Sequence, residues 1–267
     1  MVTRISRFAA AVLTALIGLT IASAGSAQVN TESLRKRIKV VGYSFIAEGS
    51  LTADTGNTEG ITVGGGLGGG WARDPHLLFA YARLDYAKYN DVESVNKTFA
   101  HLRYNYEFEK WLWGEAFVQA QSDAFQRLDL RNLFGLGPRF RVLHGALAKE
   151  FDVYLGTAYM LERDAITAEV GATGPQNQSI QVWHRWSNYV SIQWTVDERV
   201  TLGTTMYVQP ALTDFGDVRL LNETLCTFKI TKVFSAGLSG VIRYDSEPPT
   251  GVLPTDMEVK NSLLLTY

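Results

Sequence analysis

The last residues of the chain alternate between apolar and polar side chains. One face carries Met257, Val259, Leu263 and Leu265, with Asn261 as its single polar member, and the other carries Asp256, Glu258, Lys260, Ser262 and Thr266. Successive side chains of a strand point to opposite faces. Residues 256–267 are therefore predicted to form a strand with one apolar and one polar face, ending on the aromatic Tyr267.

The same period of two recurs back to about residue 41. It marks further segments at residues 41–53, 61–71, 76–89, 97–108, 111–121, 128–141, 151–161, 180–194, 199–209, 217–230 and 234–245. With the last strand this makes twelve, and ten or fourteen are the alternatives. Repeats of this kind predict an all-β fold, a closed antiparallel up-and-down transmembrane β-barrel. An even count lets both chain ends lie on the periplasmic side.

Two further patterns bear on this barrel. If the first connection between strands is external, the odd-numbered connections should be longer than the even-numbered ones. The odd-numbered connections at 90–96, 162–179 and 246–255 are indeed longer than the even-numbered ones at 73–75, 109–110 and 231–233. Aromatic residues also gather at predicted strand ends, as in the two girdles of membrane barrels. One end has Trp71, Phe108, Trp111, Phe140, Phe151, Trp194, Phe228, Phe234 and Tyr267; the other has Tyr86, Tyr159, Trp183 and Tyr244.

The N-terminus has the features of a secretory signal peptide. Arg4 and Arg7 precede an apolar run at residues 8–21, and small residues follow up to Ala27. The run is shorter than the roughly 20 residues of a spanning helix, which favours cleavage after Ala27. We therefore divide the chain into a signal peptide at 1–27, a basic periplasmic lead-in at 28–39 and a barrel at 40–267. Only a closed barrel would then hold the exported protein in the bacterial outer membrane.

Charged side chains of both signs lie on the predicted polar faces. The candidate lumen charges are Glu48, Arg103, Glu107, Glu115, Arg131, Arg139, Asp152, Arg185, Arg219, Glu223, Arg243 and Lys260. In the apolar core of a soluble periplasmic binding barrel, each ion would cost several kcal/mol. In a hydrated lumen these groups can pair and also meet water. Because the signs are mixed, we expect a narrow or blocked lumen rather than a pore selective for one sign.

Sequence motifs for catalysis or cofactors are weak. His184 and Ser187 suggest an outer-membrane lipid hydrolase, of the phospholipase or lipid A deacylase type, but a spacing of three puts them on opposite faces of a strand. Glycines 64, 66 and 69 fall inside a predicted strand, where relief of crowding is the simpler reason. The four histidines show no metal-ligand spacing, and the single Cys226 excludes an intramolecular disulfide. We predict no cofactor, no metal and no catalytic residue.

Overall composition adds little. Hydrophobic residues make up 46% and charged residues 19%, and the mean hydropathy is -0.03. Such values are compatible with a membrane barrel, because its polar lumen offsets its apolar outer wall. The formal net charge of -2 gives no indication of nucleic-acid binding.

Several stretches carry a family resemblance. Residues 207–224 read YVQPALTDFGDVRLLNET, residues 243–249 read RYDSEPP, and residues 260–267 read KNSLLLTY. Together with residues 42–58 and 97–121, they resemble the salt-induced outer membrane protein family, domain of unknown function 481. The resemblance implies an outer-membrane barrel without a settled activity: a narrow pore or structural envelope protein linked to osmotic or salt stress. It supplies no catalytic residues.

The sequence of the final strand predicts binding partners of the protein and the way in which the barrel closes. Its aromatic end resembles the signal that the barrel-assembly machinery recognises, and outer-membrane lipid is the other expected partner. The strand must also pair with the one beginning near Val41 to close the barrel. Asn261 would then face either lipid or Ser44 and Ser50 across that closure.

Overall fold

The computed structural model describes residue 35 and residues 41–54, 60–145, 150–167 and 178–266. The expected signal peptide at 1–27 lies outside these residues, as does the expected lead-in at 28–39 except for Arg35. No helix in the described part of the chain is long and apolar enough to cross a membrane.

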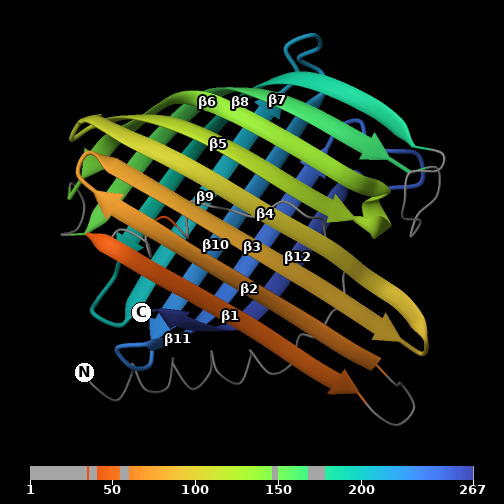
Figure 1. Cartoon of the computed structure of the whole chain (residues 1–267), viewed down its shortest axis with the longest axis horizontal. Helices are drawn as coiled ribbons and strands as arrows, with labels where there is room; N and C mark the ends of the chain where they lie inside the picture. The colour runs from red at the N-terminus through yellow and green to blue at the C-terminus, as the bar shows by residue number, and fades with distance from the viewer. Residues whose placement is uncertain (1–34, 36–40, 55–59, 146–149, 168–177, 267) are drawn as a thin grey trace.

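Twelve antiparallel strands form one closed barrel (Figure 1). They are β1 (Gly42–Asp54), β2 (Gly60–Arg73), β3 (His76–Tyr89), β4 (Val92–Glu109), β5 (Leu112–Asp123), β6 (Leu128–His144), β7 (Phe151–Ile166), β8 (Ser179–Thr195), β9 (Val200–Pro210), β10 (Val218–Lys229), β11 (Phe234–Asp245) and β12 (Thr255–Thr266). A short 3-10 helix, η1 (Ala124–Gln126), lies between β5 and β6. The predicted fold class and strand number are confirmed.

The first and last strands close the barrel, as predicted. The register of this seam runs from Ile46 opposite Thr266 to Gly49 opposite Leu263. Asn261 lies on the exposed outer face of β12, beyond the paired part of the seam. It therefore belongs to the outer wall and does not turn inward toward Ser44 or Ser50.

Alternation along each strand separates an apolar outer wall from a charged interior. In β4, Leu102 is 43% exposed on the outside, whereas Arg103, the next residue, is 4% exposed inside. This is the reverse of a soluble barrel, so the soluble binding-barrel alternative is wrong. The lumen is nevertheless not uniformly polar, because Ile46, Phe79, Tyr81 and Phe99 form a buried apolar cluster within it.

Glycines on the inner face of β2 make room for this cluster. A Cβ added at Gly66 would lie 2.2 Å from the Tyr81 hydroxyl oxygen, and one at Gly68 would lie 3.0 Å from Cδ2 of the same ring. The Tyr81 side chain therefore lies across β2, and the glycine run serves packing, as the sequence suggested, rather than phosphate binding.

Two strand boundaries differ from the prediction. The β3–β4 hairpin turns at Asn90 and Asp91, whose φ angles of 46° and 63° suit a type I′ turn. The expected connection at 90–96 is therefore wrong, and it does not support the length argument. Likewise, β7 continues to Ile166, so the start of the expected 162–179 connection is strand.

The aromatic belts are only partly as predicted. Phe108 and Trp111 are 61% and 53% exposed at the barrel end that holds the C-terminus, whereas Tyr159, predicted at the other end, is 45% exposed in the middle of β7. Trp183 is a correction, because it has the inward parity of its buried neighbour Arg185 and its indole nitrogen is buried. It lines the lumen rather than the outer wall.

Candidate functional site: the charged lumen

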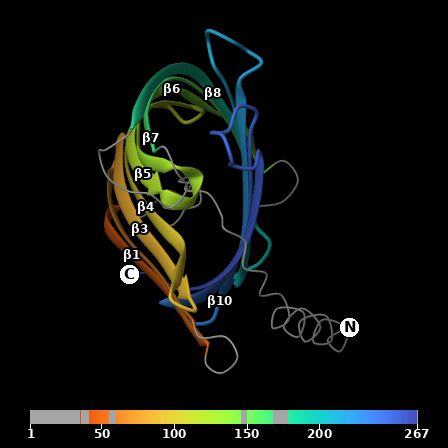
Figure 2. The same cartoon turned by 90° about the vertical axis from the view of Figure 1, so that its right-hand side faces the viewer.

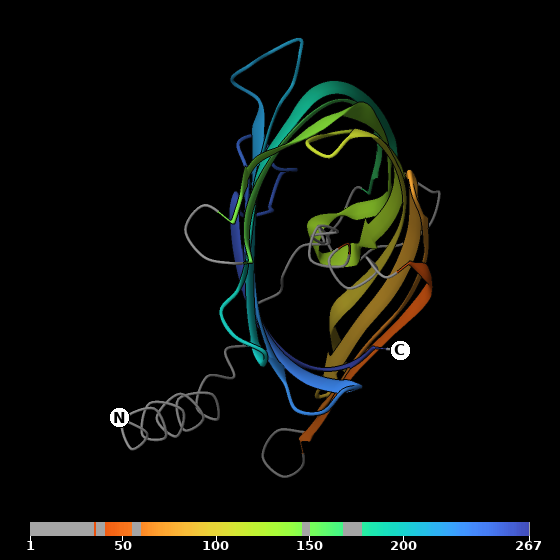
Figure 3. The same cartoon turned by 90° about the vertical axis from the view of Figure 1, so that its left-hand side faces the viewer.

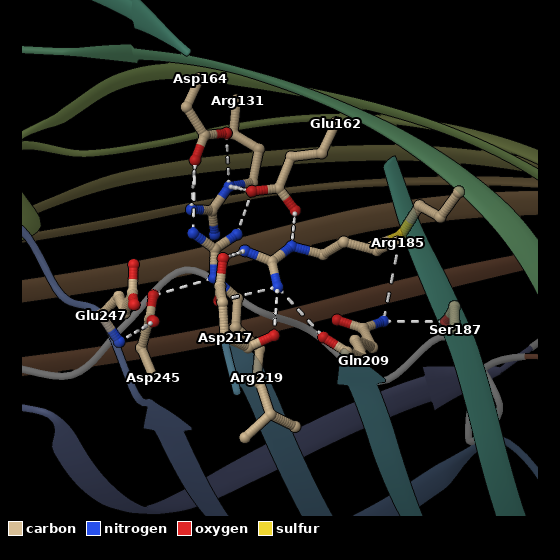
Figure 4. A network of polar contacts seen from close by, with 12 residues as sticks. Arg131, Glu162, Asp164, Arg185, Ser187, Gln209, Asp217, Arg219, Asp245 and Glu247 are labelled. Carbon is tan, nitrogen blue, oxygen red and sulfur yellow. Dashed lines mark hydrogen bonds and ion pairs between the residues drawn. The ribbon is translucent and has the colours of Figure 1, made fainter. Parts of the chain in front are cut away.

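We call the barrel end that holds the C-terminus the proximal mouth and the opposite end the distal mouth. Near the distal mouth, Glu162 on β7 lies among three guanidinium groups (Figure 4). Its carboxylate lies 3.3 Å from Arg185 Nε and 3.6 Å from Arg131 Nε, and it also accepts a hydrogen bond from Arg219. Glu162 and Arg185 are each only 1% exposed. A single buried carboxylate therefore links strands β6, β7, β8 and β10.

The same three arginines each hold a second carboxylate. Arg131 donates to both Asp164 oxygens at 2.8 and 2.7 Å, and Arg185 donates to both Asp217 oxygens at 3.0 and 3.1 Å. Arg219 Nε donates to Asp245 at 2.8 Å. We call this set the distal ion network: Arg131, Glu162, Asp164, Arg185, Asp217, Arg219 and Asp245. Bidentate geometry fixes the Arg131 and Arg185 guanidinium groups, and Arg219 is held between Glu162 and Asp245, so the network is a rigid cross-link rather than a layer of mobile charge.

Above this network, the β5–β6 connection crosses the distal mouth. Arg127 Nη1 donates to the Thr250 carbonyl at 2.6 Å, and Gln126 Nε2 donates to Asp256 at 2.6 Å. These partners belong to the β11–β12 region, six strands away around the ring. Both views along the barrel place the β5–β6 connection, in light green, within the outline of the strands (Figures 2 and 3). We call Gln126 and Arg127 the mouth bridge.

Local structure holds the mouth bridge in place. Asp123 caps η1 by accepting a hydrogen bond from the Phe125 amide at 3.1 Å, and Arg127 ends it with φ of 59°. Arg127 Nε also donates to the Thr167 carbonyl at 2.8 Å.

A cavity of about 360 Å³ lies beside the bridge, and its charged lining includes Arg131, Arg219, Arg243, Asp164, Asp245 and Asp256. Because side chains of both charge signs line this cavity, it favours neither anions nor cations.

A second cluster lies in the proximal half of the lumen, around Glu115 on β5. Glu115 accepts hydrogen bonds from Asn105 Nδ2 at 2.8 Å and from the Tyr189 hydroxyl at 2.6 Å. Arg139 lies 3.7 Å from the same carboxylate and 3.9 Å above the Tyr154 ring. Tyr189 comes from β8, three strands away, so this contact crosses the lumen.

Arg35 adds an unexpected member to this cluster. Its Nη1 donates to Glu115 Oε1 at 2.9 Å, its guanidinium lies 5.8 Å from the Trp113 ring, and it is 6% exposed. The sequence assigned Arg35 to a periplasmic lead-in. Its side chain instead lies within the lumen, where it adds one positive charge to the Glu115 cluster.

The other predicted lumen charges are distributed along the wall. Glu48 accepts hydrogen bonds from the Tyr81 hydroxyl and from Arg83 Nη1, the latter at 2.6 Å. Arg103 lies 3.9 Å from Glu115, and Glu107 accepts a hydrogen bond from the Trp113 indole at 2.9 Å. All of these groups are held by neighbours on the inner wall.

Two of the predicted groups, Arg243 and Asp152, lie near the barrel ends, Glu223 lies in the middle of β10, and one group has no described side chain. Arg243 pairs with Glu258 at 3.2 Å, Glu223 is buried, and Asp152 contacts the exposed His144 at 2.6 Å near the proximal mouth. The Lys260 side chain lies outside the described residues.

Sequence reasoning missed several charges that the structure brings into the lumen. They are Arg35, Arg83, Asp85, Glu162, Asp164, Asp217 and Asp245. For Glu162 and Asp164, the signal was present: the inward positions of β7 continue from Met160 in steps of two. They were missed because the strand was ended too early.

The structure also locates the possible hydrolase pair. His184 is on the exposed outer face and its Nδ1 lies 2.5 Å from the Tyr159 hydroxyl oxygen, whereas Ser187 is buried in the lumen and accepts a hydrogen bond from Gln209 at 2.9 Å. The prediction that these two residues face opposite sides is confirmed. Within the described residues, no group of three or more His, Cys, Asp or Glu side chains could hold a metal ion.

An apolar outer wall, a charged lumen and full antiparallel closure define an outer-membrane β-barrel. The chain belongs to the family described as "Protein of unknown function, DUF481", which it matches over residues 47–267. The family resemblance seen in the sequence is confirmed. No curated protein matches the chain.

Solved structures of outer-membrane proteins are similar to this chain at low sequence identity. The NanC porin is 10% identical, with 84% of this chain and 97% of that chain covered and a TM-score of 0.46. The KdgM porin in complex with disordered oligogalacturonate is 11% identical over 84% and 98%, with a TM-score of 0.43. The translocator domain of autotransporter NalP from Neisseria meningitidis is 12% identical over 88% and 92%, with a TM-score of 0.48.

Proposed function

We propose that this protein is a non-enzymatic outer-membrane barrel with a normally closed lumen, which conducts small solutes only when the distal mouth rearranges. The observation that carries the proposal is the pair of barriers in series at the distal mouth. The mouth bridge joins opposite walls, and the distal ion network links four strands directly beneath it. A solute must displace both barriers to pass.

The chemistry of the barriers supports a closed resting state. Buried charges remain stable only while each is paired, so moving one guanidinium away from its carboxylate carries a large penalty. The mouth bridge is weaker, because only two of its hydrogen bonds cross the lumen, from Arg127 to Thr250 and from Gln126 to Asp256, and each contributes about 0.5–1.5 kcal/mol net. Opening should therefore begin at Gln126 and Arg127, while the ion network sets the remaining resistance.

The test is single-channel conductance of the full-length protein in planar lipid bilayers. We expect rare, small openings for the wild type and a raised open probability for the double variant Gln126→Ala, Arg127→Ala. Loss of the two lumen-crossing bonds, at about 0.5–1.5 kcal/mol each, corresponds to a roughly fivefold or greater shift toward the open form. A matched control is Arg141→Ala, which removes an arginine-to-carbonyl hydrogen bond of 2.6 Å to Lys110 at the proximal mouth without bridging the lumen.

The outcome of this experiment distinguishes the pore from a purely structural barrel. If the bridge variant conducts no more than wild type and Arg141→Ala, the mouth bridge does not gate the lumen. If no variant ever carries current, including one that also lacks Arg185, the protein is structural and the conduction half of the proposal is wrong.

The cellular context is also part of the proposal. Export through a signal peptide cleaved after Ala27 would deliver the chain to the outer membrane, with assembly through its C-terminal strand. A role in osmotic or salt stress would make the barrel a component of the envelope that is needed at high salt. A deletion strain grown across a series of salt concentrations tests this role, and equal growth of mutant and parent at every concentration would argue against it.

A further inference from the structure

The outer wall carries one arginine that the lumen does not use. Arg163 on β7 is exposed on the outer face, between the inward-facing Glu162 and Asp164. Its side chain makes no hydrogen bond or ion pair with any other described residue. Its strand neighbour Val182 on β8 is apolar and 55% exposed, so the guanidinium stands beside the apolar wall rather than in a charged patch.

A lateral groove begins at Arg163 and crosses the outer wall. Paired residues on neighbouring strands form one row across this wall, which runs from Arg163 to Asn132 and then to Ala120, Ala100 and Ala82. The larger side chains of Leu102, Val118 and Phe134 form the adjacent row and also line the groove, which has a volume of about 970 Å³. Consecutive alanines on neighbouring strands thus leave an apolar channel with a cationic head.

The depth of Arg163 matches a lipid headgroup. It lies twelve positions along β7 from Phe151, in the proximal aromatic girdle. At about 3.3 Å per residue and a strand tilt of 35–45°, this spacing corresponds to roughly 28–32 Å along the barrel axis. The apolar band of a membrane barrel is about 25 Å tall, so Arg163 lies at its distal edge.

The groove descends from that edge into the apolar band. Four strand spacings of about 4.8 Å make the row from Arg163 to Ala82 roughly 19 Å long. Because the row is perpendicular to tilted strands, its far end lies about 11–13 Å deeper than Arg163. A ligand that fits must therefore have an anionic head and an extended hydrocarbon tail.

We propose that this lateral groove binds a phosphorylated, acylated lipid of the distal leaflet, with the phosphate on Arg163 and one acyl chain over Ala120, Ala100 and Ala82. The guanidinium is suited to bidentate phosphate binding, and Asn132 beside it supplies an amide donor. The alanine row gives the chain a shallow bed that larger side chains would fill. This site is on the outer wall, and its occupancy is independent of whether the lumen conducts.

Retention of added lipid by the full-length protein in mild detergent, measured by native mass spectrometry, tests the proposal. The probes are diphosphorylated lipid A, the same lipid without phosphates, and phosphatidylethanolamine. We expect the wild type to retain the diphosphorylated lipid preferentially, and Arg163→Gln to bind it about tenfold or more weakly through loss of the charged hydrogen bonds. Arg163→Lys should retain an intermediate affinity, because it keeps the charge without the bidentate geometry.

Matched variants separate the groove from general effects. Ala100→Leu fills the alanine row and should weaken binding, whereas Ala116→Leu changes an alanine on the outer face of β5 that does not line the groove. Arg199→Gln removes an exposed cation in the β8–β9 connection at the proximal mouth and should leave binding unchanged. Heat-dependent migration on a gel confirms that each variant is folded before its binding is compared.

Two results would overturn the proposal. The first is that the wild type retains phosphorylated and phosphate-free lipid equally, or that Arg163→Gln retains as much diphosphorylated lipid as the wild type. The second is a dimer in lipid-free detergent that Ala100→Leu dissociates while lipid retention stays unchanged, since a second copy of the chain would then cover the groove.

Discussion

Removing Arg185 should destabilise the barrel through the carboxylate that it leaves behind. Asp217 is 2% exposed, and both of its carboxylate oxygens receive hydrogen bonds from Arg185, at 3.0 and 3.1 Å. In Arg185→Met that carboxylate loses its charged partner. Glu162 is affected less, because Arg131 and Arg219 remain beside it.

The expected magnitude follows from the burial of this pair. Breaking a buried ion pair by removing one partner costs about 3–5 kcal/mol, whereas replacing both partners with apolar groups of similar volume is often near neutral. We therefore expect Arg185→Met to lower the free energy of unfolding by about 3–5 kcal/mol. The double variant Arg185→Met, Asp217→Leu should recover more than half of that loss.

Urea unfolding in lipid vesicles measures the effect, with the folded fraction read from heat-dependent gel migration and tryptophan fluorescence. Lys88→Met is the control, because the Lys88–Asp91 pair at 2.8 Å is solvent-exposed and its loss should not change the midpoint measurably. The reasoning fails if Arg185→Met is as stable as wild type. It also fails if the double variant is no more stable than the single one, since Asp217 would then not be the source of the loss.

Two further predictions concern packing and assembly. Gly137→Ala should lower the yield of folded barrel sharply, because the added Cβ would lie 2.0 Å from the Thr157 carbonyl oxygen. The control Gly240→Ala should fold normally, because its added Cβ meets nothing within 4 Å. Heat-dependent migration on a gel compares the folded fractions of the two variants. Removal of Tyr267 should reduce the assembled protein in isolated outer membranes if the aromatic end is read by the barrel-assembly machinery, and an unchanged assembled fraction would contradict that role.

Much of the wall could be predicted from the sequence because strand alternation is local. The inward parity of Arg103 and Glu115 follows from a period of two, and closure follows because a membrane barrel cannot expose a strand edge. Errors arose where the pattern weakens. Glu162 and Asp164 were placed in a connection because Arg163, on the intervening outward position, interrupts the apolar face that marks the rest of β7.

The contacts inside the lumen required the tertiary structure. Glu162 meets Arg219 although 57 positions separate them, and Arg127 meets Thr250 across 123 positions. Such partners are set by the register of every intervening strand pair and by where the β5–β6 connection folds. The local sequence pattern predicts neither the register of distant strand pairs nor the path of the β5–β6 connection.

The sequence by itself indicated a closed barrel with a charged interior and favoured twelve strands over ten or fourteen, because the direction of each side chain depends only on its own strand. The tertiary structure alone decided that these charges meet one another across the lumen. Whether charges of opposite sign line an open channel or meet across it depends on distances between strands far apart in the chain. Those distances place Arg35 on Glu115 and bring three arginines to Glu162.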